Sequence, residues 1–127
     1  MQERRKTNRK YLAVYSRVID RGSGRVLGYL ADLSQKGTMI ISGEPMPEKE
    51  ILNLRFDLPD PTLFPIDHLD LQASVAWSSP DIDPAFYNVG FQFLAVDEKQ
   101  AKIIDEMIVA YEFDRTRPDY PTSASML

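Results

Sequence analysis

The sequence has 127 residues, a formal net charge of -4 at pH 7, no cysteine and a single histidine, His68. A chain of this length is expected to form one domain and to bury a core without a disulfide or a metal. The composition excludes thiolate chemistry, cysteine-based metal sites and multi-histidine metal sites. No segment has the roughly 20 apolar residues that a membrane-spanning helix requires. We therefore expect a cytoplasmic protein without membrane insertion, a location that the absence of cysteine also fits.

The charges are unevenly distributed along the chain. Residues 1–10, the basic arm, contain five basic side chains and one acidic side chain, so the arm carries +4 and the other 117 residues carry -8. A basic arm on an acidic body favours an anionic ligand and argues against specific nucleic-acid binding over a broad face. The expected organisation is this arm, a folded domain over residues 11–114 and a flexible tail over residues 115–127.

Between residues 11 and 93 apolar and polar side chains alternate with a period of two, which is typical of half-buried strands. Glycine and proline clusters separate the alternating runs, because they favour turns and proline donates no backbone hydrogen bond. The expected strands cover residues 11–20, 25–30, 38–42, 52–58, 71–77 and 87–93.

After residue 93 the apolar period changes to that of a helix. Asp97 and Gln100 have the spacing of a capping box, and the predicted helix extends to about Phe113. Its apolar stripe comprises Ile104, Met107, Ile108 and Tyr111. Six short strands followed by one helix predict a mainly β fold, a six-stranded antiparallel barrel with a C-terminal α-helix.

Two short segments contain candidate ligand-binding residues. The arginine motif is Arg5-x-x-x-Arg9, preceded by Arg4, and a solubilising tail would explain it equally well when it is considered alone. The aspartate motif, residues 32–37, lies between two expected strands. An ordinary turn between strands would also explain this second motif by itself.

The aspartate motif contains Asp32, Ser34 and Gly37 in the pattern Asp-x-Ser-x-x-Gly. Asp32 and Ser34 can direct their side chains to the backbone or to a ligand, and Gly37 can adopt a positive φ that allows close approach to the main chain. Together the two motifs resemble the signatures of PilZ domains, Arg-x-x-x-Arg and Asp/Asn-x-Ser-x-x-Gly, in the same order and separated by one hairpin. The likeness continues through residues 75–77 and 89–93 and covers about residues 4–113.

The resemblance implies a six-stranded barrel that binds cyclic di-GMP. Guanidinium forks match phosphate oxygens and the O6 and N7 atoms of guanine, so Arg5 and Arg9 are expected to contact both. Asp32 and Ser34 are expected to hold a base or to orient the arginines. In PilZ proteins an arginine before the first motif accompanies a stacked ligand dimer, so Arg4 favours two ligands per chain.

Several other interpretations stay open. The chain could be a PilZ-fold adaptor that acts through protein partners without ligand, or its arm could tether it to nucleic acid or another anionic surface. We expect an unidentified downstream protein partner, and an exposed helix could pair two copies of the chain. No nucleophile–base pair, metal cluster or phosphate-cradling loop is visible, so we expect neither an enzyme nor a cofactor or metal.

Three further residues have expected positions. His68 is expected in a surface loop, and Trp77 in the core or at the rim of the ligand pocket. Lys36 could add attraction for phosphate.

Overall fold

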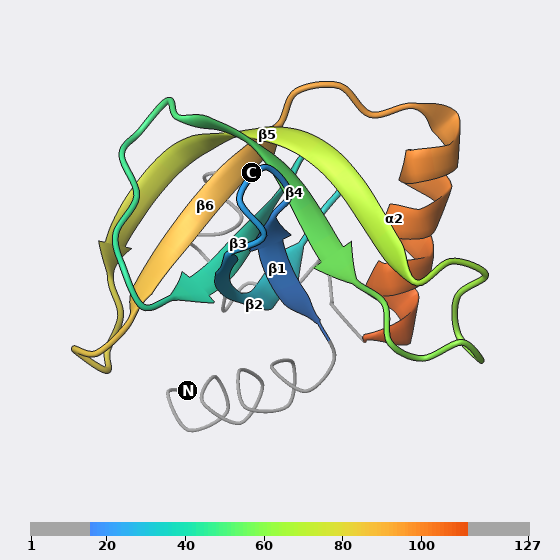
Figure 1. Ribbon diagram of the computed structural model, residues 1–127, viewed down its shortest axis with the longest axis horizontal. Helices are drawn as coiled ribbons and strands as arrows, with labels where there is room; N and C mark the ends of the chain where they lie inside the picture. Colours follow the sequence, from blue (N-terminus) through green and yellow to red (C-terminus); the bar gives the residue numbers. More distant parts are fainter. Residues whose placement is uncertain (1–15, 112–127) are drawn as a thin grey trace.

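The computed structural model describes residues 16–111. The basic arm, the arginine motif, the tail and the first five residues of the first expected strand lie outside the described residues. The strands are β1 Arg17–Asp20, β2 Val26–Leu33, β3 Gly37–Ser42, β4 Ile51–Asp57, β5 His68–Pro80 and β6 Tyr87–Phe93, and the helix α2 is Glu98–Ala110 (Figure 1). No helix within residues 16–111 is long and apolar enough to cross a membrane.

The six strands form a closed antiparallel barrel, which confirms the predicted fold class. Their order around the barrel is β1-β2-β3-β6-β5-β4, and each neighbouring pair is antiparallel. Closure satisfies the backbone hydrogen bonds that the outer strands of an open sheet would leave unpaired. The connections between strands bring the ends of β2 and β3 together at residues 34–36, where the aspartate motif turns.

The barrel interior is filled by every second residue of the strands. Leu54 and Phe56 of β4, Val75 of β5 and Phe91 of β6 are at most 1% exposed, and Phe56 packs edge-on against Phe93 with ring centroids 6.3 Å apart. Burying each such side chain contributes roughly 1.5–3 kcal/mol to folding. The period of two in the sequence therefore reflects one face in the core and one face on the barrel exterior.

The helix begins where the sequence predicts. Asp97 accepts a hydrogen bond from the Gln100 backbone N–H at 2.7 Å, and the Gln100 side chain accepts one from the Asp97 N–H at 2.9 Å. The helix ends at Ala110 rather than near Phe113, because Tyr111 departs from helical geometry. Tyr111 packs edge-on against Phe64 of the β4–β5 loop, and the buried side of the helix contains Ile104, Met107 and Ile108.

Two strands are longer than the alternation predicts. β2 continues past residue 30 to Leu33, and β5 extends over residues 68–80 rather than 71–77. Each of these strands contains a β-bulge, between Leu30 and Asp32 in β2 and between Val75 and Trp77 in β5. In β2 the bulge inserts one extra residue directly after Leu30 and interrupts the alternation, so a strict period of two ends there. In β5 the expected range already passes the bulge and is too short at both ends.

Candidate functional site

Asp32 lies within β2, so the prediction that it lies in the connection between two strands is wrong. The extra residue of the β2 bulge, Ala31, lets the strand continue, and Asp32 is paired with Met39 of β3. The Asp32 Oδ1 accepts a hydrogen bond from the Leu33 N–H at 2.9 Å, and its carbonyl accepts one from Thr38 Oγ1 at 2.7 Å. The half-buried Asp32 side chain is therefore held on β2, directly after the bulge and close to the turn.

Ser34 closes the turn between β2 and β3. Its backbone N–H donates to the Gly37 carbonyl at 2.9 Å, and its Oγ accepts from the N–H groups of Lys36 and Gly37 at 3.2 and 3.3 Å. These contacts match the ordinary serine turn that the sequence also allows. Ser34 thus stabilises the turn through hydrogen bonds to other residues of the aspartate motif.

Gly37 does not adopt the positive φ that a glycine at this position could take. It is the buried first residue of β3 and is paired with Gln92 of β6. Among the glycines of residues 16–111, Gly24 of the β1–β2 hairpin has a positive φ, 78°. A residue in an antiparallel ladder needs extended backbone angles, which explains why Gly37 does not use the positive φ that glycine allows.

An apolar row crosses the outside of the barrel next to Asp32. Paired residues of antiparallel strands share a face, so Asp32, Met39, Gly90 and Trp77 follow one another across β2, β3, β6 and β5. Trp77 is 8% exposed and packs with Ala31 and Met39 in a cluster separate from the barrel core. Trp77 is therefore buried, as expected for a core residue, but it lies outside the barrel core.

The indole of Trp77 fills the space that Gly90 leaves open. A Cβ on Gly90 would lie 2.2 Å from the indole Nε1, which is buried and has no hydrogen-bond partner within the described residues. A glycine on a strand opposite a tryptophan is the sequence signal that could have identified this arrangement.

The other predicted ligand residues are placed as follows. Arg4, Arg5 and Arg9 lie outside the described residues, so their distance from Asp32 stays a prediction. Lys36 is exposed at the turn, and its carbonyl accepts a hydrogen bond from the Phe93 N–H at 2.9 Å. The aspartate motif is thereby tied to the end of β6.

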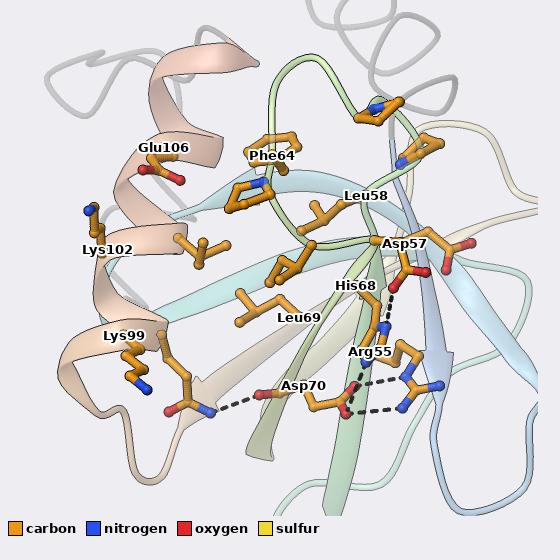
Figure 2. A pocket seen from close by; sticks show the side chains of 17 residues that line it. Arg55, Asp57, Leu58, Phe64, His68, Leu69, Asp70, Lys99, Lys102 and Glu106 are labelled. Carbon is orange, nitrogen blue, oxygen red and sulfur yellow. Dashed lines mark hydrogen bonds and ion pairs between the residues drawn. The ribbon is translucent and has the colours of Figure 1, made fainter.

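A second feature is a groove of about 1300 Å³ between α2 and the β4–β5 loop, here called the α2 groove (Figure 2). Leu58, Phe64 and Leu69 line its middle, and Lys99 and Glu106 belong to the helix side. No residue of the aspartate motif lines it. The groove and the motif are therefore separate features of the surface.

Opposite charges balance one another at the strand end of the α2 groove. Arg55 donates two hydrogen bonds to Asp70, at 2.8 and 3.1 Å (Figure 2). Arg21 lies 3.6 Å from the same carboxylate. The hydrogen bond from Arg55 holds the pKa of Asp70 below its ordinary value, and partial burial opposes this shift. This network cross-links β1, β4 and β5 and has the character of a structural ion cluster.

His68 is the first residue of β5 rather than a loop residue, because it pairs with Asp57 of β4. Its Nδ1 lies 2.6 Å from Asp67 Oδ1 and its Nε2 lies 3.8 Å from Asp70. The ring is 42% exposed, which agrees with the expected surface position. Within residues 16–111 no group of three acidic, histidine or cysteine side chains could hold a metal ion.

Comparison with known structures supports the same fold. The PilZ domain of YcgR from Escherichia coli, solved with c-di-GMP, matches with a TM-score of 0.56 and 15% identity, covering 89% of this chain and 88% of that chain. The Bacillus subtilis inhibitor of motility MotI/DgrA matches with a TM-score of 0.58 and 11% identity over 80% of this chain. The match spans about half of that protein, 48% of its chain.

No curated protein matches the sequence. The family model of the PilZ domain matches residues 3–110, which include both motifs, all six strands and the whole of α2. This match covers most of the sequence and agrees with the barrel topology and with the position of the aspartate motif at a strand end. The chain belongs to the PilZ domain family.

Proposed function

We propose that this chain is a cytoplasmic, non-enzymatic receptor for cyclic di-GMP that signals to a downstream protein partner. The observation that supports this most is the aspartate motif, which is complete in sequence and held at the junction of β2 and β3 on a PilZ-family barrel. The structure of the YcgR domain was solved with c-di-GMP, which supports the same ligand class here.

Each motif residue has a chemical role in this proposal. Arg5 and Arg9 bind phosphate oxygens and the Hoogsteen edge of guanine, because a guanidinium fork matches both acceptor pairs. Asp32 accepts hydrogen bonds from the N–H donors on the other guanine edge. Each charge-assisted hydrogen bond contributes about 1.5–3 kcal/mol. Ser34 keeps the turn in shape, and Gly37 leaves room at the start of β3.

The number of ligands is a second part of the proposal. Arg4 stacks on a guanine face and offsets additional phosphate charge, so that two stacked cyclic di-GMP molecules bind per chain. Ligand binding neutralises the basic arm and fixes it across the barrel. The combined surface of arm, ligand and barrel is then the feature that a partner protein distinguishes from the free receptor.

The arginine motif is tested by calorimetric titration of cyclic di-GMP into the wild-type protein, Arg5→Ala and Arg9→Ala. We expect each variant to lose at least tenfold in affinity, because each loses a charge-assisted fork worth more than about 1.4 kcal/mol. Arg25→Ala is the matched control, since Arg25 is an exposed arginine of the β1–β2 hairpin outside both motifs. Equal affinity of all four proteins would reject the arginine motif as a ligand site.

The same titration separates the alternative functions. A pocket discriminates cyclic di-GMP from GMP and from other cyclic dinucleotides, whereas a basic tether binds many polyanions with a steep dependence on salt. An adaptor without ligand shows no heat of binding with any nucleotide. A stoichiometry of two that falls to one in Arg4→Ala supports the stacked pair, and a stoichiometry of one in the wild type overturns it.

A further inference from the structure

Gln35 connects the aspartate motif directly to α2. Its side-chain Nε2 donates one hydrogen bond to the Ala101 carbonyl at 2.9 Å and another to Asp105 Oδ1 at 2.8 Å. The amide group of glutamine has two N–H donors, so both are used on the same helix. The two acceptors are four residues apart and therefore lie on one face of α2.

This contact joins two parts of the molecule that are otherwise held independently. The turn is tied to β6 through Lys36, and the helix is held by its buried side chains and by Gln100, which donates to the Asp70 carbonyl at 2.8 Å. Gln35 is the residue of the turn whose side chain reaches α2 in the described contacts. A change in the turn can therefore be transmitted to the helix through a single side chain.

The helix also lies against the α2 groove on another face. Lys99, Lys102 and Ile103 line that groove, whereas Ala101 and Asp105 accept from Gln35. At its C-terminal end the helix is followed by Tyr111, which packs against Phe64 in the groove wall. A shift of α2 relative to the barrel therefore changes the groove.

We propose that Gln35 is a positioning residue that couples ligand binding at the aspartate motif to the position of α2. This inference rests on the proposed function. The backbone bond that closes the turn, from the Ser34 N–H to the Gly37 carbonyl, is 2.9 Å long, whereas the bonds from the Lys36 and Gly37 N–H groups to Ser34 Oγ are longer, at 3.2 and 3.3 Å. A ligand bound at the motif can therefore shift the residues beside Gln35 without opening the turn. Gln35 carries this change to α2, and a partner that holds α2 raises ligand affinity by the same factor, as thermodynamic linkage requires.

The test is amide hydrogen exchange over residues 98–110, with and without saturating cyclic di-GMP, in wild-type protein, Gln35→Ala and the isosteric Gln35→Glu. Without ligand, both variants are expected to exchange these amides about three- to tenfold faster, the effect of losing one or two hydrogen bonds. Ligand slows exchange of α2 in the wild type and leaves it unchanged in both variants. Gln72→Ala is the matched control, because Gln72 is an exposed glutamine of β5.

Calorimetry on the same samples separates the possible failures. We expect the affinity of Gln35→Ala for cyclic di-GMP to stay within about threefold of wild type, a difference of less than 1 kcal/mol. A changed hydrogen exchange of α2 in this variant is then not caused by weaker ligand binding. Identical α2 exchange in wild type and Gln35→Ala without ligand overturns the role of Gln35 whether or not ligand binds. An equal response of α2 to ligand in both proteins overturns the coupling, and absence of binding to the wild type overturns the proposed function.

Discussion

At the scale of single residues, the outer face of the barrel depends on a pair formed by Gly90 and Trp77. Trp77 lies over Gly90 because no Cβ separates the indole from the β6 backbone. The indole is thereby buried outside the core, in the row of residues that begins at Asp32. Trp77, at the other end of this row, also packs with Met39, the residue paired with Asp32.

A substitution at Gly90 tests this arrangement. Gly90→Ala would place a Cβ 2.2 Å from the Trp77 Nε1 and 2.3 Å from Cε2, so the indole must move. We expect destabilisation of about 1–3 kcal/mol, the usual result of overpacking. Trp77 is the only tryptophan of the sequence, so a red shift of its fluorescence reports the displacement directly.

The control for this substitution is Gly43→Ala. A Cβ on Gly43 meets nothing within 4 Å, so the free energy of unfolding should change by less than about 0.5 kcal/mol. Equal stability of the Gly90 and Gly43 variants, with unchanged tryptophan emission, would contradict the packing of Trp77 on Gly90.

At the scale of elements, an ion cluster joins three neighbouring strands on the side of the barrel that faces the α2 groove. Asp70 of β5 lies between Arg55 of β4 and Arg21, which follows β1. The pKa of Asp70 is lowered by the hydrogen bond from Arg55, so the folded protein favours the ionised carboxylate. Its contribution to stability is complete above the ordinary aspartate pKa and is lost as the pH falls through the lower pKa of the folded state.

We therefore expect Asp70→Asn to lower the melting temperature at pH 7 on the order of 2–4 °C. This difference from wild type should shrink as the pH falls below about 3.9, because the wild-type carboxylate then becomes protonated too. Thermal unfolding from pH 7 to pH 2.5 measures it. Glu48→Gln, which removes the same charge at an exposed position, is the control, and a pH-independent difference for Asp70→Asn would refute the electrostatic explanation.

At the scale of the whole molecule, the sequence predicts what is local and misses what depends on distant pairing. Alternation predicts the strands because one face of a closed barrel is buried, and the spacing of Asp97 and Gln100 predicts the helix start. The bulge at Ala31, which places Asp32 on β2, depends on pairing with β3. The contact of Gln35 with Asp105 joins residues 70 positions apart, and no local pattern indicates it.

The central claim is that Asp32 and the arginine motif bind the same cyclic di-GMP ligand. Its most direct test is a calorimetric titration of Asp32→Ala and Asp32→Asn beside the wild type. Asparagine keeps an acceptor for the Leu33 N–H, and the family signature accepts it, so we predict weaker binding that stays within about tenfold of wild type. Alanine removes the acceptor, and we predict a loss of more than about tenfold in affinity. Wild-type affinity in Asp32→Ala would contradict the account.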